Sequence, residues 1–191
     1  SDKVTVIQNK FSLIDKRLLF PIAKKLKWRK PLWKIQLKQR NSILPVLQTI
    51  KRQGTLLFGD LDEFPNHSKL KHLISLTSKN QWEVYSLNQI QLVYNLRTKD
   101  GHTPWHGTIG CSIKNARNST PNKLRKLRHN SEKIEGGWHF SYFGNKNQIQ
   151  NKIRSVAPVE KHFNLSNPSL EEVSDTIKSK ANPFSKIKLD Q

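Results

Sequence analysis

The hydrophobic and polar positions in the first third of the chain predict a strand, a helix and a second strand. Residues 4–7 are rich in β-branched side chains and predict a strand. Apolar residues recur at helical spacing over residues 33–51, where Pro45 kinks or divides the helix. The short apolar run at 56–58 predicts a buried inner strand that ends or bends at Gly59.

The rest of the chain continues this alternation of strands and helices. Apolar spacing predicts a helix at 67–78 and strands at 82–87 and 90–96, whereas residues 97–110 are typical of a loop that carries function. Three further elements are a short helix opening at Ser119-Thr120-Pro121 with proline in its first position, a strand within 136–144 and a helix at 147–156. A last short helix begins with the capping box Ser169-Leu-Glu-Glu172. The alternation predicts an α/β fold, in which helices flank a mixed sheet.

The length and composition indicate how many domains the chain forms and where in the cell it is located. A chain of 191 residues suffices for one domain with a proper core. We assign residues 1–163 to this domain and residues 164–191 to a polar tail with one short helix. One cysteine, Cys111, excludes an internal disulfide. No run approaches the roughly 20 apolar residues of a membrane span, and the start lacks a signal-peptide pattern. These features favour a cytoplasmic or membrane-surface location.

The net charge of +20 predicts attraction to a polyanion, whether nucleic acid, an anionic membrane or a phosphate-rich glycan or nucleotide. Residues 16–40 are strongly basic, with Trp28 and Trp33 interleaved among the lysines. This segment is either a solvated, lysine-rich surface or a surface that binds phosphates or an anionic membrane.

An acidic cluster follows the strand at 56–58. Asp60, Asp62 and Glu63 occur within four positions, after a long stretch that contains no acidic residue. On an extended segment, side chains two apart point the same way, so Asp60 and Asp62 would aim at one point near the sheet edge. Paired carboxylates there suit Mg²⁺ or Mn²⁺. The alternative is a solvated turn whose aspartates cap the next element, but the flanks poor in acidic residues favour the metal.

Five segments together resemble glycosyltransferase family 17, which includes β-1,4-mannosyl-glycoprotein 4-β-N-acetylglucosaminyltransferases. The segments, in chain order, are Gly59-Asp60-Leu61-Asp62-Glu63-Phe64-Pro65, Tyr85-Ser86-Leu87-Asn88, Trp105-His106-Gly107-Thr108, Leu124-Arg125 and Gly136-Gly137-Trp138-His139-Phe140-Ser141. The resemblance runs from about residue 4 to residue 160. It implies a GT-A-like (Rossmann-like) fold, Mn²⁺ or Mg²⁺, a nucleotide-sugar donor such as a UDP-sugar, a glycan acceptor and inversion at the sugar carbon.

The chain departs from the family pattern in two places. Members usually carry another strand and helix before the segment that resembles residues 4–12, so we expect the first strand–helix unit to be missing here. After Lys152-Ile153-Arg154-Ser155 the family tends to place a histidine and then an acidic residue, whereas this chain has Pro158 and Glu160.

The resemblance also implies a role for each matching residue. Asp60 and Asp62 would hold the metal against the donor diphosphate. His139 would contact the metal or the diphosphate, and Lys152 and Arg154 would add positive charge beside the leaving group. The substrate-binding residues would be Trp105, Gly107, Thr108, Gly137 and Trp138. The ordinary alternatives are a packed histidine at 139, solvated cations at 152 and 154, and core packing for one of the two tryptophans.

An inverting transfer also needs a general base. The candidates are Glu63 and Glu160, and Glu63 is alternatively a brace for the acidic turn.

Two other classes of function remain open. One is a metal-dependent nuclease with Asp60, Asp62 and Glu63 as ligands, and the other is a basic nucleic-acid-binding module. Neither needs the aromatic segments at 105–108 and 136–143 in that order, which argues against nucleic acid as the partner.

Overall fold

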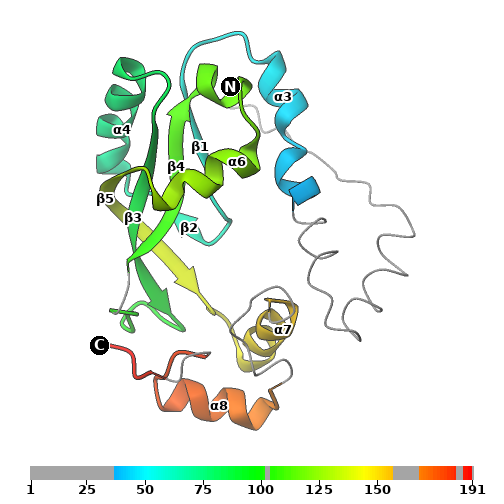
Figure 1. Ribbon diagram of the computed structural model, residues 1–191. Coiled ribbons are helices and arrows are strands. Elements are labelled where there is room, and N and C mark those ends of the chain that lie inside the picture. The colour runs from blue at the N-terminus through cyan, green and yellow to red at the C-terminus, as the bar shows by residue number, and fades with distance from the viewer. Residues whose placement is uncertain (1–36, 102–103, 157–167, 184–186, 191) are drawn as a thin grey trace, which may run out of the picture.

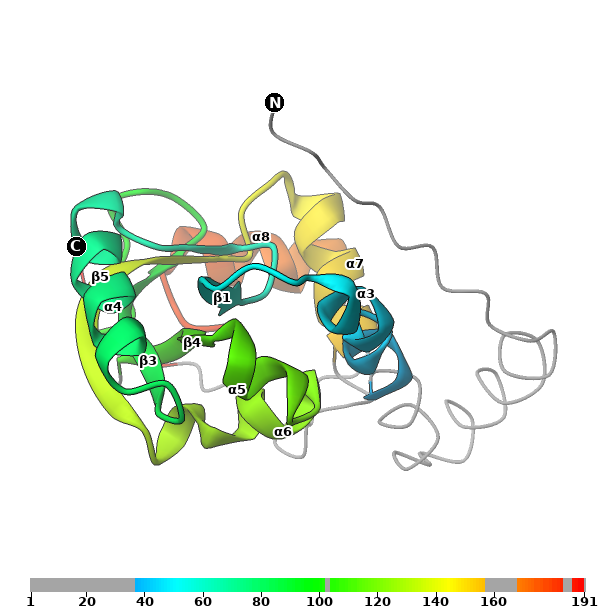
Figure 2. The ribbon, with the colours of Figure 1, turned by 90° about the horizontal axis from the view of Figure 1, so that it is seen from above.

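The computed structural model describes residues 37–101, 104–156, 168–183 and 187–190. Over these residues the chain has a mixed α/β fold, with one five-stranded mixed sheet that curls strongly into a half-barrel (Figures 1 and 2). The strand expected at 4–7, most of the basic segment 16–40 and Glu160 lie outside the described residues.

The strand order across the sheet is β1-β4-β3-β5-β2. The strands are β1 (Thr55–Phe58), β2 (Glu63–Phe64), β3 (Val84–Val93), β4 (Trp105–Ser112) and β5 (Glu132–Ser141). The pair β3–β5 is parallel, and the other three pairs are antiparallel. A mixed sheet was predicted and is confirmed. The expected inner position of the strand before Gly59 is wrong for the described sheet, because β1 pairs there with β4 alone and forms an edge.

Most of the predicted helices are present. They are α3 (Leu44–Thr49), α4 (His67–Lys79), α6 (Pro121–Lys126), α7 (Lys146–Val156) and α8 (Leu170–Lys178). Two short elements occur in addition, α5 (Ile113–Arg117) and the 3₁₀ turn η2 (Leu127–His129). The first predicted helix is divided as expected, since residues 37–41 and α3 are separated by a turn just before Pro45. Pro121 begins α6 after an N-cap by Thr120, and the Ser169 capping box forms.

Helices cover both faces of the sheet because successive residues of a strand point to opposite sides. Val84 of β3 packs in a cluster with Leu47 of α3 and Leu124 of α6. Its neighbour Tyr85 packs in a second cluster with Leu73 of α4. Figure 1 shows α4 on one side of the strands and α3 and α6 on the other.

A third core lies beyond the far ends of β3 and β5, where α7 and α8 pack (Figure 1). Ile149 and Ile153 of α7 meet Val173 of α8 and Leu189 of the C-terminal segment there. Val173 and Leu189, from the C-terminal region predicted as a polar tail, are therefore buried apolar side chains of this core.

Two secondary-structure predictions are wrong in part. Residues 105–110, expected in a loop, belong to β4, and the two strands expected at 82–87 and 90–96 are the single strand β3. The polar residues Asn88 and Gln89 obscured the continuity of β3. Gln89 is nevertheless buried, and its side-chain Oε1 accepts from the backbone N–H of Thr108 at 3.3 Å.

Candidate functional site

The acidic segment forms a tight turn, not an extended strand. The amide of Glu63 donates to the carbonyl of Asp60 at 3.1 Å, and Leu61 lies fully exposed at the tip. The expected extended chain at Asp60–Asp62 is therefore wrong, because these residues form a turn. Each aspartate meets a different cationic partner.

Glu63 anchors this turn. Its side chain is fully buried, and both carboxylate oxygens are engaged. Oε1 accepts from Trp105 Nε1 at 2.9 Å and from Arg125 Nη2 at 3.0 Å. Oε2 accepts from the Asp60 amide and from Thr108 Oγ1, each at 3.1 Å. A carboxylate held in this way braces the turn. This is the structural role predicted from the sequence as the alternative to a general base.

Asp60 pairs with Arg125. The same guanidinium nitrogen, Nη2, donates to Asp60 Oδ2 and to Glu63 Oε1. The Asp60 side chain remains 46% exposed, whereas that of Arg125 is 4% exposed. Arg125 therefore joins the buried anchor to an accessible carboxylate.

Asp62 pairs with Lys152 of α7 and lies next to His139 of β5. Lys152 Nζ donates to Asp62 Oδ2 at 2.7 Å, and His139 Nε2 is 3.5 Å from the same oxygen. Partial burial by itself would raise the pKa of Asp62, but the hydrogen bonds and charges of His139 and Lys152 outweigh it. The pKa is held well below its usual value, so Asp62 stays ionised at neutral pH.

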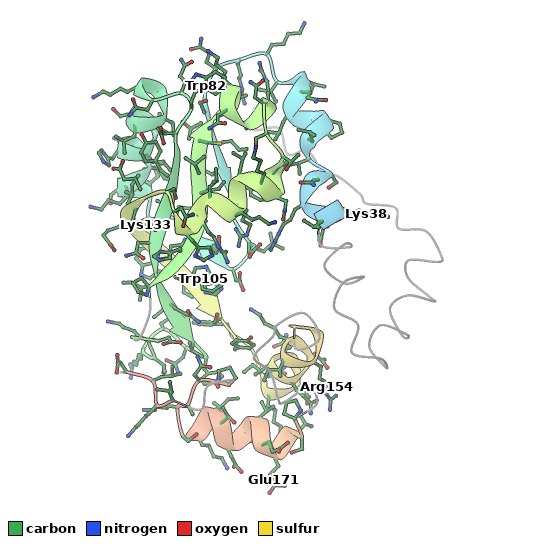
Figure 3. The ribbon with its side chains drawn as sticks, viewed as in Figure 1. Lys38, Trp82, Trp105, Lys133, Arg154 and Glu171 are labelled. Atoms are coloured by element: carbon green, nitrogen blue, oxygen red, sulfur yellow. The ribbon has the colours of Figure 1, made fainter. Side chains whose placement is uncertain are left out.

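An aromatic contact connects the two ion pairs. The indole of Trp105, which donates to Glu63, stacks on the imidazole of His139 with a centroid separation of 4.2 Å and an interplanar angle of 17°. Figure 3 shows Trp105 where β4 begins, near the middle of the molecule. Because His139 is buried beside Asp62, the Asp60–Arg125 and Asp62–Lys152 pairs belong to one connected cluster.

Pairing of β2 with β5 puts the cluster on one face of this short ribbon. Glu63 is opposite His139, and the next pair, Phe64 and Trp138, points to the other face. Gly137 lets the strands approach, since its φ is +120° and a Cβ there would come within 2.4 Å of the Phe64 carbonyl.

Several expected site residues are not brought to the cluster. Trp138 is 38% exposed on the opposite face of the β2–β5 ribbon. Arg154 lies on α7, where its Nη2 is 3.5 Å from the carbonyl of Pro168 (Figure 3). Gly107 packs against the side chain of Gln89, whose Oε1 would lie 1.7 Å from a Cβ added at position 107. Glu160 is outside the described residues.

Three arginines at this site had no role in the sequence-based assignment. Arg125 lies on α6, Arg128 on η2 and Arg40 in the helical residues 37–41. The sequence predicted a basic helix beginning at Pro121. Only the tertiary fold shows that Arg125, like its neighbour Leu124, is buried.

The donor set restricts the kind of metal site that is possible. Among the described residues, no group of three or more His, Cys, Asp and Glu side chains can enclose a metal ion. Asp60 and Asp62 are partly exposed, hard oxygen donors. They are ligands of the type that Mg²⁺ and Mn²⁺ prefer, and an ion that they held would take its remaining oxygens from a substrate or water.

A large cavity lies away from the acidic turn. It has a volume of about 600 Å³ and lies between α7 and α8, lined by Tyr94, Ile149, Ile153 and Val173 among others. Neither aspartate lines it.

Comparisons with known proteins add no family. No family model, curated protein or solved structure matched the chain. Within the described ranges, none of the helices combines the length and apolar character that crossing a bilayer requires.

Proposed function

We propose that the chain is a metal-dependent, inverting glycosyltransferase with a GT-A-like fold. It would move a sugar, such as N-acetylglucosamine, from a nucleoside-diphosphate donor, most simply a UDP-sugar, to a glycan hydroxyl. The observation that carries the proposal is the braced Asp60–Glu63 turn, which presents two partly exposed carboxylates among Arg125, Lys152 and His139.

The mixture of charges at the turn suits a metal-bridged diphosphate. Asp60 and Asp62 would hold the divalent cation, which when bound would neutralise charge on the leaving diphosphate. Lys152 and Arg125 lie against the two carboxylates and would supply positive charge beside the diphosphate. Because His139 and Lys152 keep the pKa of Asp62 low, this ligand would be ionised without a proton having to leave.

The bracing network argues for a division of labour among the carboxylates. Glu63 is a positioning residue in this proposal, since both of its oxygens are committed to hydrogen bonds and neither faces solvent. The general base that accepts the acceptor's proton is then Glu160, the other candidate from the sequence.

The proposal is tested by donor binding and turnover. A panel of UDP-sugars with Mn²⁺ should raise the melting temperature of the wild type and be hydrolysed slowly or transferred to a glycan, with inversion visible by NMR. Asp62→Asn should lose both effects. The matched control Asp175→Asn should keep them, because Asp175 is exposed on α8.

The nuclease alternative predicts a different result. Mn²⁺-dependent cleavage of DNA or RNA that disappears in Asp62→Asn, with no response to any nucleotide sugar, would replace the transferase by a nuclease.

A further inference from the structure

Three arginines converge beside Asp60 and Glu63. Arg125 contacts both carboxylates. Arg40 and Arg128 lie near this pair. The two carboxylates raise the pKa values of Arg40 and Arg128, and the charge of Arg125 lowers them. The guanidinium of Arg128 also lies over the Trp105 ring, 5.2 Å from its centroid, and Trp105 is itself hydrogen-bonded to Glu63.

The positive charge of this group exceeds the negative charge beside it. Burial, followed by the charge of Arg125, lowers the pKa of both Arg40 and Arg128, although Asp60 and Glu63 act in the opposite direction. Among the described side chains, two carboxylates therefore do not compensate three half-buried or buried guanidinium groups. A further anion would relieve both the repulsion and the desolvation.

Arg125 also has hydrogen-bond donors to spare. It is 3% exposed, and its buried Nε and Nη1 have no hydrogen-bond partner among the described residues. Within the described part of the chain, only Nη2 has hydrogen-bond partners, which are Asp60 and Glu63. Buried donors normally find acceptors, and guanidinium N–H groups are strong donors to phosphate oxygens.

We propose that Arg40, Arg125 and Arg128 form a phosphoryl-binding site that works without a metal ion. The Arg128 guanidinium packs over the Trp105 ring, and the Asp60 carboxylate bound by Arg125 is partly exposed. The proposal of an anion site depends only on the observations at the three arginines. Its assignment to the diphosphate of a nucleotide donor rests on the proposed function.

The experiment is calorimetric titration with inorganic pyrophosphate and with UDP, in EDTA and at low salt. Arg128→Gln and Arg40→Gln are the informative variants, because they leave the buried Arg125–Glu63 pair intact. Each should weaken binding at least about tenfold. The matched control Arg97→Gln, at an exposed position between β3 and β4, should bind like the wild type. Thermal unfolding checks that all variants fold.

The outcomes separate this site from the proposed function. Equal pyrophosphate binding by the wild type, Arg128→Gln and Arg40→Gln, or no binding in EDTA at all, overturns the arginine site even if Mn²⁺-dependent sugar transfer is found. Arginine-dependent pyrophosphate binding without sugar transfer supports the site and removes the transferase.

An oligonucleotide is the third titrant. If a short single-stranded oligonucleotide binds more tightly than UDP, and Arg128→Gln abolishes this binding, the diphosphate assignment is overturned. Weaker, arginine-independent oligonucleotide binding supports it.

Discussion

The carboxylate of Glu63 and the guanidinium of Arg125 meet at 3.0 Å, 62 positions apart in the chain, and almost no solvent reaches either side chain. A buried ion pair is costly to disrupt from one side, because the remaining charge loses its partner without gaining water. This pair therefore ties the acidic turn to the folded core.

Glu63→Gln should be strongly destabilising. The amide keeps one acceptor but no charge, so Arg125 is left buried with Asp60 as its only anionic contact among the described side chains. We expect a loss of about 3 kcal/mol in the free energy of unfolding, measured by urea denaturation. The exposed control Glu83→Gln should change stability by less than about 0.5 kcal/mol. A Glu63→Gln protein as stable as the wild type would show that the brace is dispensable.

Asp62→Asn should separate metal binding from folding. Asp62 is partly exposed, so losing its bond to Lys152 should cost about 1 kcal/mol of stability or less. Mn²⁺ binding, followed by electron paramagnetic resonance in the presence of UDP, should fall to the background level. Retention of that binding would remove Asp62 from the ligand set.

Gly59→Ala should damage the site through a steric clash. A Cβ at Gly59 would lie 2.4 Å from Thr108 Oγ1 and 2.8 Å from Glu63 Oε2, the two atoms that share a hydrogen bond. Both side chains are buried, so we expect a loss of about 1–3 kcal/mol by urea denaturation. Leu61→Ala, at the exposed tip of the same turn, is the control and should be tolerated. A neutral Gly59→Ala would mean that Glu63 can move without loss.

Acid should remove the contribution of Asp62 to stability. Its pKa is lowered in the folded state, so its contribution is complete above the unfolded value of about 4 and is lost as the pH falls towards the folded pKa. The difference in the free energy of unfolding between the wild type and Asp62→Asn should be constant at about pH 7 and 5 and smaller at about pH 3. A difference that does not change over this range would contradict the low pKa.

The sequence predicted the structural features that depend on a few neighbouring residues. The proline that begins α6 and the capping box of α8 act within one helical turn, and both formed as expected. The composition Trp-His-Gly-Thr at the start of β4 suggested a loop instead, because a strand that lines a polar site lacks the apolar alternation of a core strand.

The candidate site was only partly predictable for a related reason. Asp60 and Asp62 were conspicuous as an acidic pair in a basic chain, but their partners come from α6, β5 and α7. Arg125 was one of several basic residues in its segment, and nothing local marked it as the buried one. The bracing role of Glu63 depends on Trp105 and Thr108, which only the sheet brings near.

These separations along the chain also bear on how the domain folds. The bond from Trp105 to Glu63 spans 42 positions and the bond from Lys152 to Asp62 spans 90, so no local segment can assemble the cluster. Contacts of this range form only after the intervening loops have closed, at a cost in chain entropy. A ligand held by the cluster would bind only the completed fold and would therefore stabilise the whole domain against unfolding, from α6 to α7 together.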